Sequence, residues 1–226
     1  MTARPLVAVA HGSRDPAGQH AVEALLDVVR GRRPDLAVDA AYVQNAPPPL
    51  ADVLAARGTG AVVVPLLLSH GYHVAVDVAL AAAAAEAVVT PPLGPHPGLA
   101  DALDARLTQA GVPPRAPVVL AAAGSSDPAA GEDVTEQARL LADRRGGPVT
   151  AAYASAGTAR VDDAVADLLR RYARPVAVAP YLLAPGSFAA RIRQAAATWV
   201  ADPIGAHPAV ADLVLERYLA AARIAR

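Results

Sequence analysis

Two histidines, His11 and His73, are the side chains in this sequence that are best placed for metal or proton chemistry. Each comes soon after a short apolar run, Leu6–Ala10 for His11 and Gly60–Leu68 for His73. If both runs are parallel strands, their carboxyl ends meet at the sheet edge where open parallel sheets bind ligands. Two neutral imidazoles with an amide or carboxylate nearby suit a divalent ion such as Co²⁺, Fe²⁺, Ni²⁺ or Zn²⁺. The pair therefore predicts a metal site. The alternative for His11 is a turn histidine that hydrogen-bonds a backbone carbonyl.

Gly12 and Ser13 follow His11 and form a second candidate feature. A tight turn there offers backbone N–H groups that could hold an anion. A serine hydrolase is not indicated, because a nucleophile elbow needs Gly-x-Ser-x-Gly and Ser13 lacks both glycines. The glycine-rich motifs that bind nucleotide phosphates are also absent. The sequence therefore argues against a nucleotide-dependent enzyme.

The other four histidines have simpler interpretations. His70 is followed by a glycine, which favours a loop and a solvent-facing rim position over a metal ligand. His20 opens a helical segment and is expected at the surface. His96 and His207 occupy matching positions in two similar segments, so both are assigned to a scaffold turn.

Composition and charge exclude several classes of protein. The 226 residues are 54% hydrophobic and 18% charged, which is ample for a buried core. Lys and Arg number 20 and Asp and Glu 21, so the net charge is −1 and the basic excess of a nucleic-acid-binding protein is absent. The absence of cysteine excludes disulfides, thiolate metal sites and a catalytic thiol. No apolar run reaches the roughly 20 residues of a membrane span, and no signal-peptide pattern is present. We therefore expect a soluble, cytoplasmic protein with no nucleic-acid or membrane partner.

Short apolar runs alternate with longer segments of helical spacing, the pattern of βαβ units and a parallel sheet. The strands and helices predicted for the first half are, in chain order, Leu6–Ala10, Gln19–Arg30, Leu36–Val43, Pro49–Arg57, Gly60–Leu68, Val74–Ala87, Ala87–Thr90 and Pro97–Ala110. The same order repeats from Val118 to Ile224. The predicted fold class is therefore α/β, with two duplicated halves, each a four-stranded parallel sheet flanked by helices.

The duplication extends to individual residues. The segment His11–Pro16 corresponds to Ala123–Pro128, and Arg106 corresponds to Arg217. We predict a first half over residues 1–111, a proline-rich linker over 112–116 and a second half over 117–226.

The duplication also acts as an internal control for function. Residues present in both halves are expected to serve the fold, whereas residues present in one half are candidates for chemistry. His11 has Ala123 as its counterpart, and His73 has Phe188. The predicted metal site therefore belongs to the first half.

Two segments of the first half resemble the sirohydrochlorin chelatases. Residues 10–15 read AHGSRD, and residues 64–77 read VPLLLSHGYHVAVD. The segment LGPHP at residues 93–97 and the helix that carries Arg106 are also similar to that family. The resemblance covers the whole first half, with the second half as a degenerate copy.

The resemblance implies a fold and an activity. The fold is two similar α/β halves with a cleft between them. The activity is that of the class II, ATP-independent chelatases, which insert Co²⁺ or Fe²⁺ into sirohydrochlorin. The metal-site histidines of the family fall on His11 and His73, which are implied as metal ligands and catalytic residues. A neutral histidine accepts protons near pH 7, and two pyrrole N–H protons must leave the macrocycle.

The resemblance also implies residues that contact the substrate, a tetrapyrrole rich in carboxylates. Those expected to do so are Ser13, Arg14, Gln44, Leu68, Ser69, His70, Gly71 and Tyr72. Gln44 departs from the family pattern, which often has an acidic residue there. Its amide can coordinate weakly through the carbonyl oxygen but cannot accept a proton.

Other functions stay open at this point. A non-catalytic carrier of metal or tetrapyrrole would keep the fold and the histidine pair, and Gln44 fits such a role. A sugar- or nucleotide-binding module rests on fold class alone. Because both halves lie in one chain, we expect a monomer. The residues do not choose between cobalt and iron.

Overall fold

The computed structural model describes residues 3–155 and 159–224, and the side chains of residues 72–75 and 224 lie outside the description. The chain divides into two compact units, one of Met1–Leu93 with Gly205–Arg226 and one of Gly94–Ile204. Each unit contains one four-stranded sheet, and every strand pair in both sheets is parallel. The predicted α/β fold with two parallel sheets is confirmed.

The sheet of the first unit has the order β2-β1-β3-β4. Its strands are β1 (Leu6–Ala10), β2 (Val38–Tyr42), β3 (Val62–Pro65) and β4 (Val88–Val89). All five residues of β1 are buried, because neighbours cover the strand on both faces. A parallel sheet covered by helices needs such continuous apolar strands, and Leu-Val-Ala-Val-Ala supplies one.

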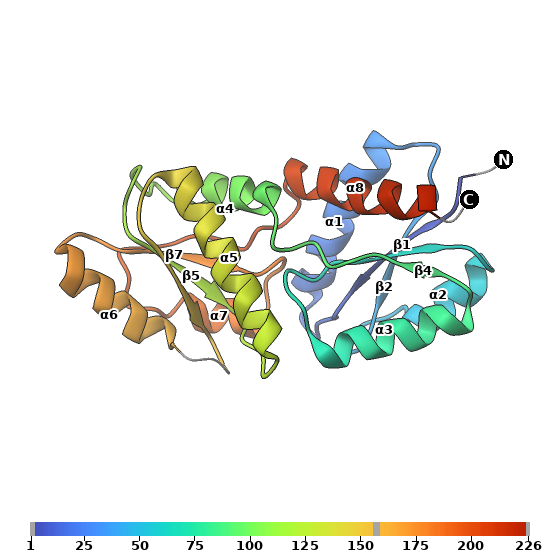
Figure 1. The fold of residues 1–226 in the computed structure, drawn as a ribbon, viewed down its shortest axis with the longest axis horizontal. Coiled ribbons are helices and arrows are strands. Elements are labelled where there is room, and N and C mark those ends of the chain that lie inside the picture. Colours follow the sequence, from blue (N-terminus) through green and yellow to red (C-terminus); the bar gives the residue numbers. More distant parts are fainter. Residues whose placement is uncertain (1–2, 156–158, 225–226) are drawn as a thin grey trace. The chain divides into compact units, whose positions relative to one another are not determined.

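Helices cover both faces of this sheet. Figure 1 shows α1 (Pro16–Arg32) and α8 (Pro208–Ile224) on one side, and α2 (Leu50–Arg57) and α3 (Tyr72–Ala84) on the other. The α2 and α3 side holds a core cluster in which Val7 and Val9 of β1 pack with Leu54 of α2 and Val78 of α3. Helices therefore cover both faces of the central strand β1. A ligand can reach this strand only at its carboxyl end, where His11 follows it.

The second unit repeats this plan. The order of its sheet is β6-β5-β7-β8, formed by β5 (Val118–Ala122), β6 (Val149–Tyr153), β7 (Ala177–Tyr181) and β8 (Trp199–Val200). Its helices are α4 (Pro97–Gln109), α5 (Pro128–Arg145), α6 (Val161–Tyr172) and α7 (Ser187–Ile192). The two sheets thus have the same strand order, as a duplication requires.

The closing helix of each sequence half packs in the unit formed mainly by the other half. Helix α8 contacts α1 and β3, and the Tyr218 hydroxyl donates to the Arg4 carbonyl oxygen at 2.8 Å. Helix α4 contacts α5 and β7. The compact units therefore divide the chain after residues 93 and 204, whereas the predicted boundary between 111 and 117 marks the sequence repeat.

Residues 112–116, expected to be a linker, are packed within the second unit. Val112 and Ala116 are buried, and Arg145 of α5 donates to the Pro113 carbonyl oxygen at 2.9 Å. This segment is packed because α4 lies directly against α5.

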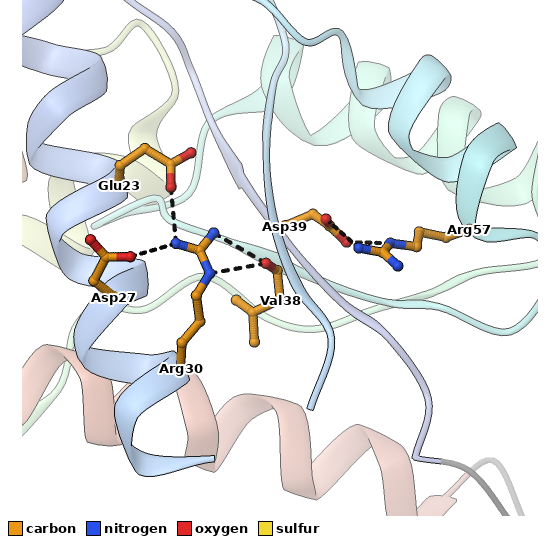
Figure 2. Close-up of polar contacts among 6 residues, drawn as sticks. All are labelled: Glu23, Asp27, Arg30, Val38, Asp39 and Arg57. Atoms are coloured by element: carbon orange, nitrogen blue, oxygen red, sulfur yellow. Dashed lines mark hydrogen bonds and ion pairs between the residues drawn. The ribbon is translucent and has the colours of Figure 1, made fainter. Parts of the chain in front are cut away.

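Two arginines join helices to β2, the strand that leads into Gln44. Figure 2 shows Arg30 of α1 donating to the Val38 carbonyl oxygen at 3.1 and 3.2 Å while it pairs with Glu23 and Asp27 of its own helix. Arg57 of α2 forms a bidentate pair with Asp39, with both N–O distances at 2.5 Å. These bonds fix β2 against helices on both sides of the sheet.

Most predicted elements differ from the observed ones by one to three residues at their ends, and for two of them the local reason is plain. Helix α1 begins at Pro16 and not Gln19, because the Asp15 carboxylate caps it by accepting from Ala17 N at 2.9 Å. The strand predicted over residues 60–68 is observed only over Val62–Pro65. Its last part leaves the sheet as a loop, and this loop leads into α3.

Candidate functional site

His11 lies at the carboxyl end of β1, at the edge of the sheet. Beyond the strand ends, Val43 N donates to Ala10 O and Gln44 N donates to His11 O, each at 3.0 Å. The backbone ladder between β1 and β2 therefore continues past both strands and brings the loops together. The His11 side chain is exposed there, as a ligand-binding residue at this edge must be.

The side chain of Gln44 reaches the imidazole of His11. Its amide nitrogen lies 2.9 Å from the Nε2 atom of His11. With the amide in this orientation, the Gln44 nitrogen donates and the Nε2 atom of His11 accepts. The Nε2 lone pair is then engaged by Gln44, so a metal ion or a proton must displace this hydrogen bond to reach it.

Gly12 permits the close approach of the two loops. Its φ is +97°, and a Cβ atom at this position would lie 1.7 Å from the Gln44 carbonyl oxygen. No side chain fits in that space. The glycine after the histidine is therefore a requirement of the site's geometry, and its counterpart Gly124 has a similar φ of +101°.

Ser13 and Arg14, both predicted substrate contacts, have different surroundings. The Ser13 hydroxyl accepts from Asp15 N at 3.0 Å, and its counterpart Ser125 accepts from Asp127 N at 3.1 Å. This shared bond gives Ser13 a role in the turn before the helix. Arg14 is exposed, and its guanidinium makes no hydrogen bond or ion pair with the described residues.

The loop after β3 lies beside the loop that carries His11. Leu66 N donates to Val9 O at 2.8 Å, which ties the start of the loop to β1. Leu68 and Ser69 are partly buried and His70 is exposed, which agrees with the rim position expected for His70. Gly71 precedes the first residue of α3.

Tyr72 and His73 open helix α3, and their side chains lie outside the described residues. The convergence of His73 on His11 stays a prediction. Among the side chains that are described, no group of three or more His, Asp or Glu residues could hold a metal ion.

The other histidine interpretations can be compared with the structure. His96 caps α4 by accepting from Gly98 N at 3.1 Å, and His207 accepts from Ala209 N at 3.2 Å. Both have the scaffold role that their matching positions predict. His20 is exposed on α1, as expected.

Tyr42, the last residue of β2, adds no base to the site. Its side chain is buried, and burial, with a smaller contribution from Glu23, raises the pKa of the phenol above its usual value. The phenol is therefore neutral in the pH range in which histidines titrate.

The equivalent edge of the second unit holds arginines that the sequence motifs did not reveal. Arg160 and Arg191 line a small pocket of about 50 Å³ together with Ser155 and Asp162. The signal that could have found them is the same comparison of halves, applied to residues that the second half gains and not only to those it loses.

The chain is similar to known chelatase sequences and structures. The sequence model of the CbiX family matches it twice, over residues 5–110 and 117–221. No curated protein matches it. None of the helices in the described part of the chain has the length and apolar character of a membrane span.

Three solved structures share the fold. SirB from Bacillus subtilis with Fe³⁺ has a TM-score of 0.82 and 24% identity, over 99% of this chain and 97% of that one. CbiX, described as the terminal enzyme of siroheme biosynthesis in denitrifying bacteria, has a TM-score of 0.75 and 27% identity, over 96% and 99%. DR2241 from Deinococcus radiodurans, a multi-domain protein with structural similarity to chelatases, has a TM-score of 0.72 and 26% identity, over 96% and 55%.

These comparisons agree with the motifs around His11 and after β3. The two matches of the family model follow the duplication, and the solved structures extend over nearly all of this chain. The chain belongs to the CbiX family of sirohydrochlorin chelatases, in the form that carries two repeats in one chain.

Proposed function

We propose that this protein inserts Co²⁺ or Fe²⁺ into sirohydrochlorin without a nucleotide, with His11 as metal ligand and proton acceptor. The observation that carries the proposal is the exposed imidazole at the carboxyl end of β1, with its Nε2 atom held 2.9 Å from the Gln44 amide. Two related structures, both of SirB from Bacillus subtilis, contain Fe³⁺ and cobalt. Iron and cobalt are the two elements that the proposal names, although the iron in that structure is Fe³⁺ and the proposed substrate is Fe²⁺.

The reaction exchanges two protons for one ion. A divalent ion replaces the two pyrrole N–H protons of the macrocycle, so two protons must be taken up as the ion loses its water. The Nε2 atom of His11 accepts one proton after the ion has passed from it to the macrocycle, because its single lone pair cannot bind both, and His73 is proposed as the second acceptor. Because the Gln44 amide cannot accept a proton, the base function falls on the two histidines.

The carboxylates of sirohydrochlorin need donors near the site. Arg14 is suited to this role, because its guanidinium is exposed and has no partner among the described residues. The backbone N–H groups of Gly12 and Ser13 and the loop over residues 68–72 are proposed to complete the contacts.

An anaerobic absorbance assay tests the proposal. Sirohydrochlorin and Co²⁺ or Fe²⁺ are mixed with substoichiometric protein, and the metallated spectrum is recorded over time. Many turnovers per protein, lost in His11→Ala and kept in His20→Ala, are the expected result. His20→Ala is the matched control because His20 is an exposed histidine on α1, outside the site.

The same assay separates an enzyme from a carrier. A spectral change that stops at one equivalent of protein would replace the proposed catalysis with binding alone, the role that Gln44 in place of an acid would suit. Insertion by His11→Ala at the wild-type rate would remove His11 from the mechanism.

A further inference from the structure

The second unit holds a pocket beside the start of helix α5. Its volume is about 650 Å³, which lies within the roughly 300–1,000 Å³ of small-molecule sites. The pocket is lined by the turn over residues 125–128 and by Gly131, Glu132, Thr135 and Glu136 of α5. The helical positions recur every three or four residues, so they share one face of the helix. All lining residues belong to the second unit, and the pocket is therefore a property of that unit alone.

A glycine opens this pocket. Gly131 is the counterpart of Gln19 in the first half (131 − 19 = 112, the offset of the repeat). In the first unit, the Gln19 side chain extends toward the Ser13 carbonyl oxygen, which lies 3.5 Å from its amide nitrogen. The second unit has no side chain at this position. A Cβ atom placed on Gly131 would lie 3.7 Å from the Tyr153 hydroxyl.

Tyr153 presents an unpaired hydroxyl to the space that Gly131 leaves. The residue ends β6 and is 9% exposed. Its hydroxyl makes no hydrogen bond with the described residues, and it lies next to the position of the missing Cβ atom. Burial raises the pKa of the phenol, so the group keeps its proton. A buried hydroxyl without a partner costs free energy, and a ligand in the pocket would supply that partner.

The charged side chains that line the pocket are all acidic. Asp127 caps α5 by accepting from Ala129 N at 3.0 Å, which offsets the positive end of the helix dipole. Glu136 is paired with Arg139 at 2.7 Å. Glu132 is exposed and forms no ion pair within the described part of the chain. The pocket thus has one carboxylate without a counter-charge, and it attracts a cation.

The lining argues against two classes of ligand. Ser126 and Glu132 correspond to Arg14 and His20 of the first half (126 − 14 = 112; 132 − 20 = 112). The second half therefore lacks the positive charge that suits a carboxylate. A bare divalent ion needs several ligands around one point, and no group of three or more His, Asp or Glu among the described residues could hold one. The pocket instead fits a larger cation.

We propose that this pocket binds a small organic amine as its ammonium ion, with Glu132 as the charge partner and the Tyr153 hydroxyl as a hydrogen-bond acceptor. An ammonium group has only donors, which matches a carboxylate beside a phenol oxygen. The volume leaves room for the carbon chain of the amine. The inference goes beyond metal insertion and is independent of it, because it uses no residue of the first unit.

Isothermal titration calorimetry of the full chain with putrescine, a four-carbon diamine, tests the proposal. The wild-type protein should bind putrescine saturably and should not bind the uncharged four-carbon diol of the same length. Glu132→Gln should weaken binding by about two- to five-fold, the range of an exposed ion pair. Tyr153→Phe should weaken it by about two- to ten-fold, the range of one hydrogen bond.

Gly131→Gln is the sharpest variant, because it gives the pocket the side chain that the first half has. It should abolish saturable binding and leave the melting temperature unchanged or higher, since glutamine forms helices better than glycine and the new Cβ atom has room. Glu86→Gln, which removes an exposed acid of the first unit, is the matched control and should bind putrescine as the wild type does.

Four results would overturn the proposal. They are no saturable binding by the wild type, wild-type affinity in Gly131→Gln, equal binding of the diol, and displacement of putrescine by Mg²⁺ at equal concentration. The last result would make the site one for an inorganic ion. None of them bears on metal insertion, which the absorbance assay tests separately.

Discussion

Gly12→Ala should destabilise the first unit and displace His11. The new Cβ atom would lie 1.7 Å from the Gln44 carbonyl oxygen, and real contacts of this kind are not shorter than 3.0 Å. The two loops must therefore separate by 1.3 Å (3.0 − 1.7 = 1.3). The bond from Gln44 N to His11 O, now 3.0 Å, cannot survive that movement.

The size of the effect follows from these two changes. An alanine in the left-handed region costs roughly 1–2 kcal/mol, and the lost hydrogen bond costs about 1 kcal/mol. The sum is about 2–3 kcal/mol. At about 4 °C per kcal/mol for a unit of this size, the melting temperature should fall by roughly 8–12 °C. A displacement of about 1 Å at a catalytic group can also lower the rate by roughly a hundred-fold.

Two other glycines separate the steric effect from the conformational one. Gly58 has a φ of +73° and Gly31 lies in α1, and at both positions a new Cβ atom would have no neighbouring atom within 4 Å. Gly58→Ala should lose about 1–3 kcal/mol from its backbone conformation alone, since φ +73° with ψ −169° is a region that only glycine commonly occupies, and Gly31→Ala should gain about 0.5–1 kcal/mol. Circular dichroism melts and the insertion assay measure all three. The reasoning fails if Gly12→Ala has the same melting temperature as Gly58→Ala and inserts metal at the wild-type rate.

Three further substitutions give expected outcomes. His11→Ala should lower insertion by about 10²–10⁴-fold with an unchanged melting temperature, because the second unit folds with Ala123 at the same position; a large fall in melting temperature would return His11 to a structural role. Ala123→His should leave the insertion rate unchanged, since Phe188 stands where a second ligand would be needed, and a clear gain in rate would contradict this. Arg145→Met should destabilise the protein by about 3 kcal/mol in denaturant titration, because it leaves the partly buried Asp104 with fewer donors; a loss below about 1 kcal/mol would show that the pair contributes little.

The sheets could be predicted from the sequence because a strand that is buried on both faces needs a continuous run of apolar residues. The run Leu6–Ala10 is apolar at every position, and the structure buries every one of its residues. The start of α1 was predicted less well. Its apolar spacing begins inside the helix, whereas the helix itself begins where the Asp15 side chain caps it. Periodicity locates the packed part of a helix better than its ends.

The packing partners of the closing helices could not be predicted from the sequence. Arg106 of α4 donates to Ile204 O at 2.9 Å, and its counterpart Arg217 of α8 donates to Pro92 O at 3.1 Å. The two helices are similar, so either could cover either sheet. An apolar stripe shows that a helix is packed but does not identify its partner.

The candidate site was predictable in part, for a related reason. His11 could be placed because it directly follows a strand, and the edge of a parallel sheet is fixed by strand direction. Its contact with Gln44 could not, since that depends on how far the two loops approach each other, and Gly12 sets that distance. Arg160 and Arg191 belong to no sequence motif that indicates a binding site, so their common pocket could not be predicted.

The exchange of closing helices gives a physical reason why the second half could change its chemistry and keep its fold. Each compact unit needs a helix from the other sequence half, α8 for the first and α4 for the second. A second half that lost its fold would therefore deprive the first unit of the helix that packs on α1 and β3. What folding requires at the edge of the second sheet is the backbone bond between Ala123 and Ser155 and the cap of α5, and both are present. Neither depends on the side chain at position 123. Folding therefore constrains the backbone of this edge, while the side chain at position 123 and the exposed positions 160 and 191 are free to differ from their counterparts in the first half.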